Sequence, residues 1–145
     1  MKYHFQFRDV LAYWPSLLDG VATTLALTGI AIVGGLALGI LGACARLYGP
    51  KPLRLAAVTY VEAIRNTPLL IQLFLVFFGL PSAGIRLSAD TAAMVALAIN
   101  LGAYSTEIIR AGVDSIHKSQ IEAGMSLALT RLQVYRYIIL KPAFA

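Results

Sequence analysis

The first pattern along the chain is a stretch without any charged residue, from Val21 to Ala45. About 20 consecutive apolar residues suffice for a helix to cross a bilayer, so this stretch predicts a transmembrane helix. Small residues recur in it at every fourth position, which puts them on one helix face and permits close approach of a second helix. We interpret this face as a packing surface, although glycine is also common in membrane helices generally; its members are Ala31, Gly35, Gly39 and Ala43.

A second apolar stretch, Thr67 to Leu80, is interrupted only by Gln72 and is too short to cross a bilayer alone. The preceding residues, 52–66, mix charged side chains with alanines and β-branched residues. We therefore expect one long helix, polar at its start and bent near Pro68, because proline lacks the backbone N–H that an interior helical position needs. The polar part is expected to lie against protein or water rather than lipid.

A third apolar stretch predicts a span from about Leu87 to Ile109. Ser88 and Asp90 are suitable capping residues for its start. Before the first span, residues 5–18 carry apolar side chains at roughly helical spacing among scattered charges. This pattern favours an interfacial helix that lies on the bilayer, with a partly ordered tail as the alternative.

The segment 119–142 is polar and helical in pattern, and it follows the third span directly. Ser119 with Glu122, and Thr130 with Gln133, each fit a capping box, in which two side chains satisfy free N–H groups at a helix start. Two helix starts so close together predict two short helices joined near residues 129–130. Apolar stripes on both helices predict that they pack as a hairpin, with Arg131 and Arg136 projecting from the second helix and Pro142 limiting its continuation.

Composition agrees with an all-α membrane protein. Of the 145 residues, 59% are hydrophobic and only 13% are charged, whereas soluble domains carry about 25% charged residues. Lys and Arg number 12 against 7 Asp and Glu, but this excess lies between the spans, so membrane topology explains it better than nucleic-acid binding. The positive-inside rule predicts a cytoplasmic hairpin and an N-terminus outside. The single cysteine, Cys44, between two alanines, is expected to be buried and inert.

Polar groups inside the spans have two interpretations. Gln72 and Asn100 either line a substrate route or, as we favour, hydrogen-bond another helix. Glu62 with Arg65, and Glu107 with Arg110, are three residues apart and either pair on one helix face or form a gate or an intersubunit contact.

The sequence gives no indication of catalysis. It lacks a GxxxxGK[ST] phosphate loop, so ATP hydrolysis by this chain is not expected. Asp114 and His117 lie one turn apart without a third ligand, which argues against a metal site and for a solvated face. Neither a nucleophile with a base nor a pair of acids occurs in the spans, which disfavours an intramembrane enzyme.

Three segments resemble, in order, the signatures of binding-protein-dependent ABC transporter permeases, the MetI-like family. The hairpin resembles the EAA loop of that family at Glu122-Ala123-Gly124, Ala128, Gln133, Arg136 and Ile139-Leu140. Residues 62–72 and 100–112 resemble signatures of its polar amino acid branch. Three matches in order are specific, and the resemblance covers nearly the whole chain from about Gly20.

The resemblance implies a bacterial inner-membrane permease subunit for amino acids, with a partial MetI-like fold over a single domain, residues 1–145. It implies a cytoplasmic ATPase, a second permease subunit and an external substrate-binding protein as partners, and no cofactor or metal in this chain. The EAA loop is the helix that docks on the ATPase, so the resemblance and the projecting arginines give these coupling residues: Glu122, Ala123, Gly124, Ala128, Arg131 and Arg136. Residues proposed for the translocation pathway or an intersubunit contact are Glu62, Arg65, Gln72, Asn100 and Glu107.

The chain departs from the family pattern at three motif positions and in length, and one of these positions is Leu140-Lys141-Pro142, where the family has Leu-Pro. Gly124 replaces the third motif alanine, which is expected to loosen its helix by up to about 1 kcal/mol. Ala128 replaces the motif glycine, so a turn that needs positive φ is expected to be difficult there. These permeases usually have five spans, and the chain resembles one truncated after the EAA loop. A membrane scaffold that docks the ATPase without transporting is therefore an alternative function.

Overall fold

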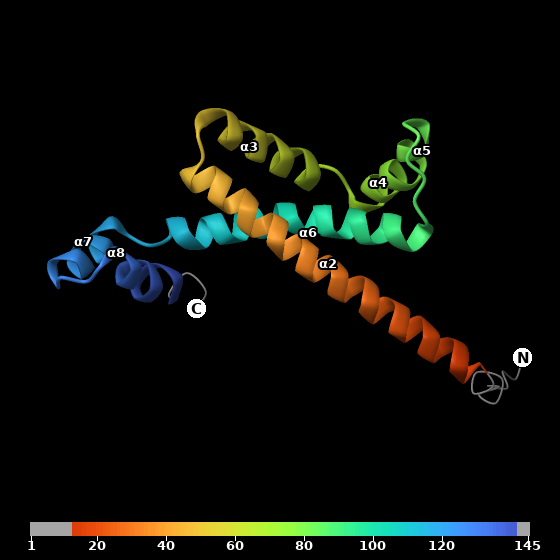
Figure 1. Cartoon of the computed structure of the whole chain (residues 1–145), viewed down its shortest axis with the longest axis horizontal. Coiled ribbons are helices and arrows are strands. Elements are labelled where there is room, and N and C mark those ends of the chain that lie inside the picture. The colour runs from red at the N-terminus through yellow and green to blue at the C-terminus, as the bar shows by residue number, and fades with distance from the viewer. Residues whose placement is uncertain (1–12, 142–145) are drawn as a thin grey trace, which may run out of the picture.

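The computed structural model describes residues 13–141, and every element in this part of the chain is helical. Two long helices, α2 and α6, cross one another, with α3 to α5 along one side of α6 and a short helical hairpin beyond its end (Figure 1). The elements are α2 (Trp14–Tyr48), α3 (Lys51–Arg65), α4 (Leu69–Phe74), the π-helical η1 (Leu75–Gly79), α5 (Leu80–Ser82), α6 (Ala89–Asp114), α7 (Lys118–Ser126), α8 (Arg131–Gln133) and the π-helical η2 (Val134–Leu140).

Helix α2 contains the first predicted span and is longer than a span requires. Its 35 residues correspond to about 52 Å of helix, against about 30 Å for the hydrocarbon core. The predicted interfacial stripe lies in part outside the described residues, since 1–12 are not among them. Its remaining part, from Trp14, forms the first turns of α2, so an interfacial segment there is continuous with the span.

The small-residue face of α2 is confirmed as a packing surface. The buried residues of this helix are the four members of the predicted ladder, and they lie against α6. A Cβ atom on Gly35 would lie 2.7 Å from Leu101 Cβ, and one on Gly39 would overlap Ser105 Cβ and lie 3.3 Å from its carbonyl carbon. The approach is reciprocal, because a Cβ on Gly102 would lie 2.8 Å from Leu38 Cβ. Glycine therefore sets the distance between these two backbones.

The second predicted span is broken rather than gently bent. Helix α3 ends at Arg65, α4 begins at Leu69, and their axes turn by 106°. Expecting one long helix was therefore wrong. Pro68 cannot donate to the ladder, and it disfavours helical geometry at Thr67 before it. Helices α2 and α6 are each long and apolar enough to cross a membrane, and α3 with α4–α5 makes a third span if the broken pair counts as one.

The third predicted span corresponds to α6. Its N-cap is Ser88, whose hydroxyl accepts a hydrogen bond from the Thr91 backbone N–H at 3.2 Å, as the sequence predicted. The helix continues past the predicted end at Ile109 to Asp114. Three residues, 115–117, then lead into the hairpin, which lies beyond this end of α6 (Figure 1).

Cys44 corrects another expectation, since its thiol is exposed rather than buried. Only one face of α2 packs against α6, and that face includes Ala43 but not its neighbour. Successive helical residues point about 100° apart, so the cysteine lies outside the row of buried residues.

Candidate functional site

The hairpin begins at a different residue from the one predicted. The N-cap of α7 is His117, whose Nδ1 accepts from the Ser119 backbone N–H at 3.4 Å and lies 2.8 Å from Ser119 Oγ. The helix starts at Lys118, which places Ser119 inside its first turn rather than at its cap. The predicted capping box at residues 119–122 was therefore wrong, and the histidine predicted to be a surface residue has a structural role as well.

The turn between the two arms forms despite the missing glycine. Ala128 adopts a φ of 58°, the left-handed region. The Leu129 N–H donates to the Gly124 carbonyl at 3.2 Å, and the Ala128 N–H donates to the Met125 carbonyl at 3.0 Å. These two bonds form a Schellman motif, which usually ends a helix at glycine. Alanine adopts this geometry at a cost of about 1 kcal/mol. The turn expected to be difficult at Ala128 therefore forms, with some backbone strain.

The second predicted capping box is confirmed. Thr130 Oγ1 accepts from the Gln133 N–H at 3.4 Å, and Gln133 Oε1 accepts from the Thr130 N–H at 2.9 Å. This reciprocal pair satisfies free N–H groups at both residues and fixes where α8 begins. The helical arm then continues through η2.

Gly124 lies inside the hairpin rather than on its outer surface. It is buried, and a Cβ atom there would overlap Ile138 Cδ1 and lie 3.5 Å from Val134 Cγ2, both on η2. The small residue thus allows η2 to pack closely on α7. The small size of Gly124 therefore allows the two arms to contact each other, a role that the sequence alone did not reveal.

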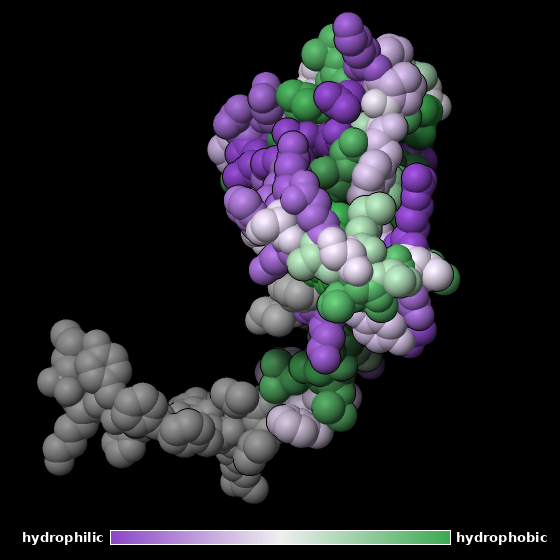
Figure 2. All heavy atoms as spheres, turned by 90° about the vertical axis from the view of Figure 1, so that its left-hand side faces the viewer, coloured by the Kyte–Doolittle hydropathy of each residue, from purple (hydrophilic) through white to green (hydrophobic). Residues whose placement is uncertain are grey.

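The other residues assigned to the hairpin surface are exposed. Hydrophilic side chains gather on the end of the molecule that carries the hairpin, with apolar ones between them (Figure 2). The guanidinium of Arg136 lies 5.7 Å from the ring centroid of Tyr137, close enough for a cation–π contact. An exposed, preformed surface of this kind suits a protein partner; its residues include Glu122, Ala123, Ala128, Arg131 and Arg136.

Gln72 and Asn100 hold the broken helix together. Gln72 is buried, and its Nε2 donates to the carbonyls of Ile64 at 2.8 Å and Thr67 at 2.7 Å. These acceptors lie where the helical ladder stops, so the side chain replaces hydrogen bonds that the break removes. Its Oε1 accepts from Asn100 Nδ2 on α6 at 3.3 Å. The favoured interpretation of both residues as packing contacts therefore agrees with their geometry.

The end of α3 makes two further contacts with α6. The Tyr60 hydroxyl donates to the Ile99 carbonyl at 2.6 Å. The Arg65 guanidinium lies 5.5 Å from the ring centroid of Tyr104. Among the described residues Arg65 does not form an ion pair with Glu62, and both side chains are exposed beside this contact. The interpretation that Glu62 and Arg65 simply pair with each other was therefore wrong.

A four-residue ion network lies at the hairpin end of the two long helices. Glu107 pairs with Arg110, as its spacing predicted, and also with Arg46 on α2. Arg110 in turn pairs with Asp114, one turn further along α6. The Arg46 contact was missed because it joins residues 61 positions apart, and no local pattern reveals which turns of two helices meet. Asp114, interpreted from the sequence as part of a solvated face, is exposed but belongs to this network.

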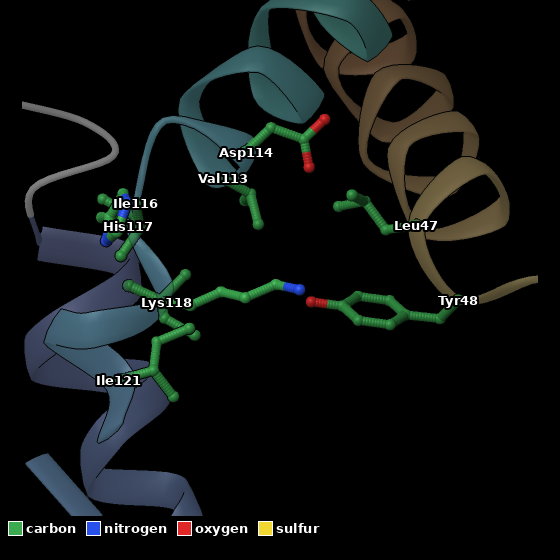
Figure 3. Close-up of a pocket in the computed structure, with 9 residues that line it drawn as sticks. Leu47, Tyr48, Val113, Asp114, Ile116, His117, Lys118 and Ile121 are labelled. Carbon is green, nitrogen blue, oxygen red and sulfur yellow. The ribbon is translucent and has the colours of Figure 1, made fainter. Parts of the chain in front are cut away.

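A pocket of about 650 Å³ lies between the ends of α2 and α6 and the hairpin. Its walls are mostly apolar, and the Lys118 and Tyr48 side chains point toward one another across it (Figure 3). In the described part of the chain, residues 13–141, His, Cys, Asp and Glu do not gather in a group of three that would hold a metal ion. The pocket thus lies where the long helices meet the hairpin.

Two helices that can cross a bilayer, with a folded polar hairpin beyond the end of one, place the chain among helical integral membrane proteins. It belongs to the family of binding-protein-dependent transport system inner membrane components, whose family model matches residues 35–145. The expected family is therefore confirmed.

Curated relatives are named as amino-acid permeases. The L-cystine transport system permease protein TcyB of Bacillus subtilis is 39% identical over 133 residues, covering 92% of this chain and 57% of the relative. The glutamine transport system permease protein GlnP of Escherichia coli is 40% identical over 137 residues, covering 91% of this chain and 63% of the relative. The chain thus spans between 57% and 63% of the length of these two relatives.

Solved structures agree with this assignment. An amino acid ABC transporter crystallised with histidines matches with a TM-score of 0.87 at 39% identity, over 98% of this chain and 66% of that one. The inward-facing MetNI methionine ABC transporter matches with a TM-score of 0.56 at 22% identity, over 99% of this chain and 66% of that one, which shows a likeness of fold alone.

Proposed function

We propose that this chain is the transmembrane permease subunit of an amino-acid ABC importer, and that it couples ATP hydrolysis by a partner subunit to substrate movement. The observation that carries the proposal is the family match across residues 35–145, together with relatives named for cystine and glutamine transport. The permease role requires no catalysis by this chain. Its expected partners are an ATPase, a second permease subunit, a substrate-binding protein and the amino acid.

The hairpin is the proposed ATPase contact. Its shape is fixed before any partner binds, because His117 and Thr130 cap its two arms and the turn at Ala128 closes it. A preformed contact loses less conformational entropy on docking than a flexible segment does. The outward-facing charges of Glu122 and Arg131 then provide the specific contacts. Gly124 contributes indirectly, by letting the arms pack.

The proposed orientation places the hairpin in the cytoplasm and the N-terminus outside. Basic residues follow the first span and accompany the hairpin, whereas the connection before α6 carries only Arg86. The positive-inside rule assigns the basic sides to the cytoplasm. This orientation supports ATPase docking, because ATP is hydrolysed on that side.

The polar residues of the spans divide into three proposed roles. Gln72 and Asn100 maintain the break between α3 and α4, which shapes the route at that level. Glu62 and Arg65, exposed on α3, are the candidates for the pathway or the contact with the second permease subunit. Glu107 belongs to the ion network near the hairpin.

The docking proposal is tested by Glu122→Lys in the permease co-expressed with its ATPase. Reversing an exposed charge in the contact should lower ATPase co-purification at least tenfold, since juxtaposed like charges cost several kcal/mol at interfaces and each 1.4 kcal/mol is about a factor of ten. Gln120→Lys is the matched control, because Gln120 is also exposed on α7 but two positions away on another face. Wild-type co-purification of Glu122→Lys would remove the docking role.

A further inference from the structure

The ion network joins α2 to the part of α6 that leads into the hairpin. Arg46 is a late residue of α2, and its guanidinium pairs with the Glu107 carboxylate. Glu107 also accepts from Arg110 Nε at 3.1 Å, and Arg110 pairs with Asp114 at the last residue of α6. Positive and negative groups alternate along this network, so its four charges neutralise one another.

The network begins where close backbone packing ends. Ala43 is the last buried residue of α2, and Thr106 is the last buried residue of α6. Beyond these two positions neither helix has a further residue classed as buried, within the part of the chain that the structure describes. Arg46 and Glu107 thus join the two helices just beyond their last buried residues, on the side of the hairpin.

The Arg46–Glu107 pair is screened from water more than a surface pair is. The exposed fractions of the two side chains are only 18% and 22%. Breaking such a pair by removing one partner is costly, because the remaining charge stays partly desolvated and unpaired. Arg110 holds the same carboxylate from its other side, which orients Glu107 toward α2.

We infer that Arg46 and Glu107 are positioning residues that tie the two long helices together, so that movement of the hairpin turns α2 and α6 as one unit. The inference rests on the proposed coupling function. The hairpin follows α6 after only residues 115–117. The pocket in Figure 3 lies between its arms and the ends of both helices, and Tyr135 of η2 also approaches Tyr48 of α2. Without the tie, the end of α6 would be free to move with the hairpin relative to the end of α2, beyond the close packing at the crossing. Coupling is transmitted by elements that move together, so ATP hydrolysis would produce less transport if the two helix ends moved independently.

The experiment measures amino acid taken up per ATP hydrolysed by the permease and its ATPase in proteoliposomes. Arg46→Gln and Glu107→Gln should each lower this ratio about tenfold, within the range for residues that carry coupling between sites, while ATPase co-purification stays at the wild-type level. Arg54→Gln is the matched control, because it removes an exposed charge that is outside the network. A wild-type ratio in the two network variants would overturn the inference.

Replacing the Arg46–Glu107 ion pair with a covalent cross-link distinguishes a contact that persists through the transport cycle from one that must open in each cycle. Arg46→Cys with Glu107→Cys, in a Cys44→Ser background, is joined by a bifunctional thiol reagent of the length that the native pair spans. The inference predicts a low transport ratio before cross-linking and recovery after it. Loss of transport on cross-linking would overturn it, since the pair would then have to separate in each cycle. Failure of wild-type permease to co-purify with the ATPase would instead count against the proposed function.

Discussion

The α2–α6 crossing and the hairpin are stabilised in opposite ways. At the crossing, the buried residues are small, and the two backbones come close at Gly35, Gly39 and Gly102. Each of these glycines packs against residues of the other helix, which lie far away in the sequence. In the hairpin, the buried residues are Gly124 and Val134, and the shape depends on caps and a turn within a few residues of sequence. The crossing therefore depends on which helices meet, whereas the hairpin depends on its own local sequence.

This difference predicts how each region responds to change. A larger side chain at the crossing would push the two long helices apart, because it would press on the backbone of the other helix, which cannot move aside as a flexible side chain can. Changes in the hairpin alter single hydrogen bonds or one dihedral angle, so their effects are smaller and stay local. The break between α3 and α4 combines both kinds of contact, because the Gln72 side chain bonds a carbonyl nearby in the sequence and also Asn100 on α6.

The largest effect is expected for Gly39→Leu. Its Cβ would overlap Ser105 Cβ and press on the backbone of α6, so we expect a loss of about 3 kcal/mol of stability. Thermal unfolding in detergent measures it. Gly29→Leu is the matched control, because a Cβ there meets nothing within 4 Å. Equal melting temperatures for the two variants would contradict close packing at the crossing.

An intermediate effect is expected for Gln72→Leu. The carbonyls of Ile64 and Thr67 lose their side-chain donor, and Asn100 loses its acceptor, at a cost of about 1–3 kcal/mol. The same unfolding measurement applies, with Gln120→Leu on the exposed face of α7 as the control. If the Gln72 variant melted with the control, the side chain would not be what holds the break.

The smallest effect, and a stabilising one, is expected for Ala128→Gly. Glycine adopts a φ of 58° without steric cost, so the hairpin should gain about 1 kcal/mol. Hydrogen exchange of the amides of Leu129 and Ala128 measures the local gain. Ala123→Gly, at an exposed position inside α7, should instead loosen the helix. Faster exchange in Ala128→Gly would show that the turn is not strained.

Sequence patterns predicted what depends on neighbours along one helix. The four-residue spacing of Ala31 to Ala43 located the packing face, and Thr130 with Gln133 located the second cap. His117 was missed because histidine is not among the preferred N-cap residues. The spacing of Ser119 and Glu122 predicted an N-cap at Ser119, whereas the observed N-cap, His117, lies two residues earlier.

What could not be predicted requires knowledge of how distant helices are aligned. The Arg46–Glu107 pair and the Tyr60–Ile99 contact follow from the depth at which α2 and α3 meet α6, which no local pattern contains. The sharp turn at Pro68 was underestimated for the same reason. Proline predicts a disruption, but the Gln72 contacts that stabilise a 106° turn come from the tertiary structure.

The crossing in Figure 1 also has a geometric consequence for the bilayer. Residues 20–45 of α2 are free of charge over about 39 Å of helix, whereas the charge-free part of α6, residues 91–106, measures about 24 Å. A hydrocarbon layer about 30 Å thick is thinner than the first length and thicker than the second. A tilt of roughly 40°, the upper end of observed tilts, would fit the first stretch into it, whereas any tilt of the second increases its mismatch. The crossing of the two helices lets the longer one tilt while the shorter one stays more upright, so their unequal apolar lengths are compatible with one bilayer.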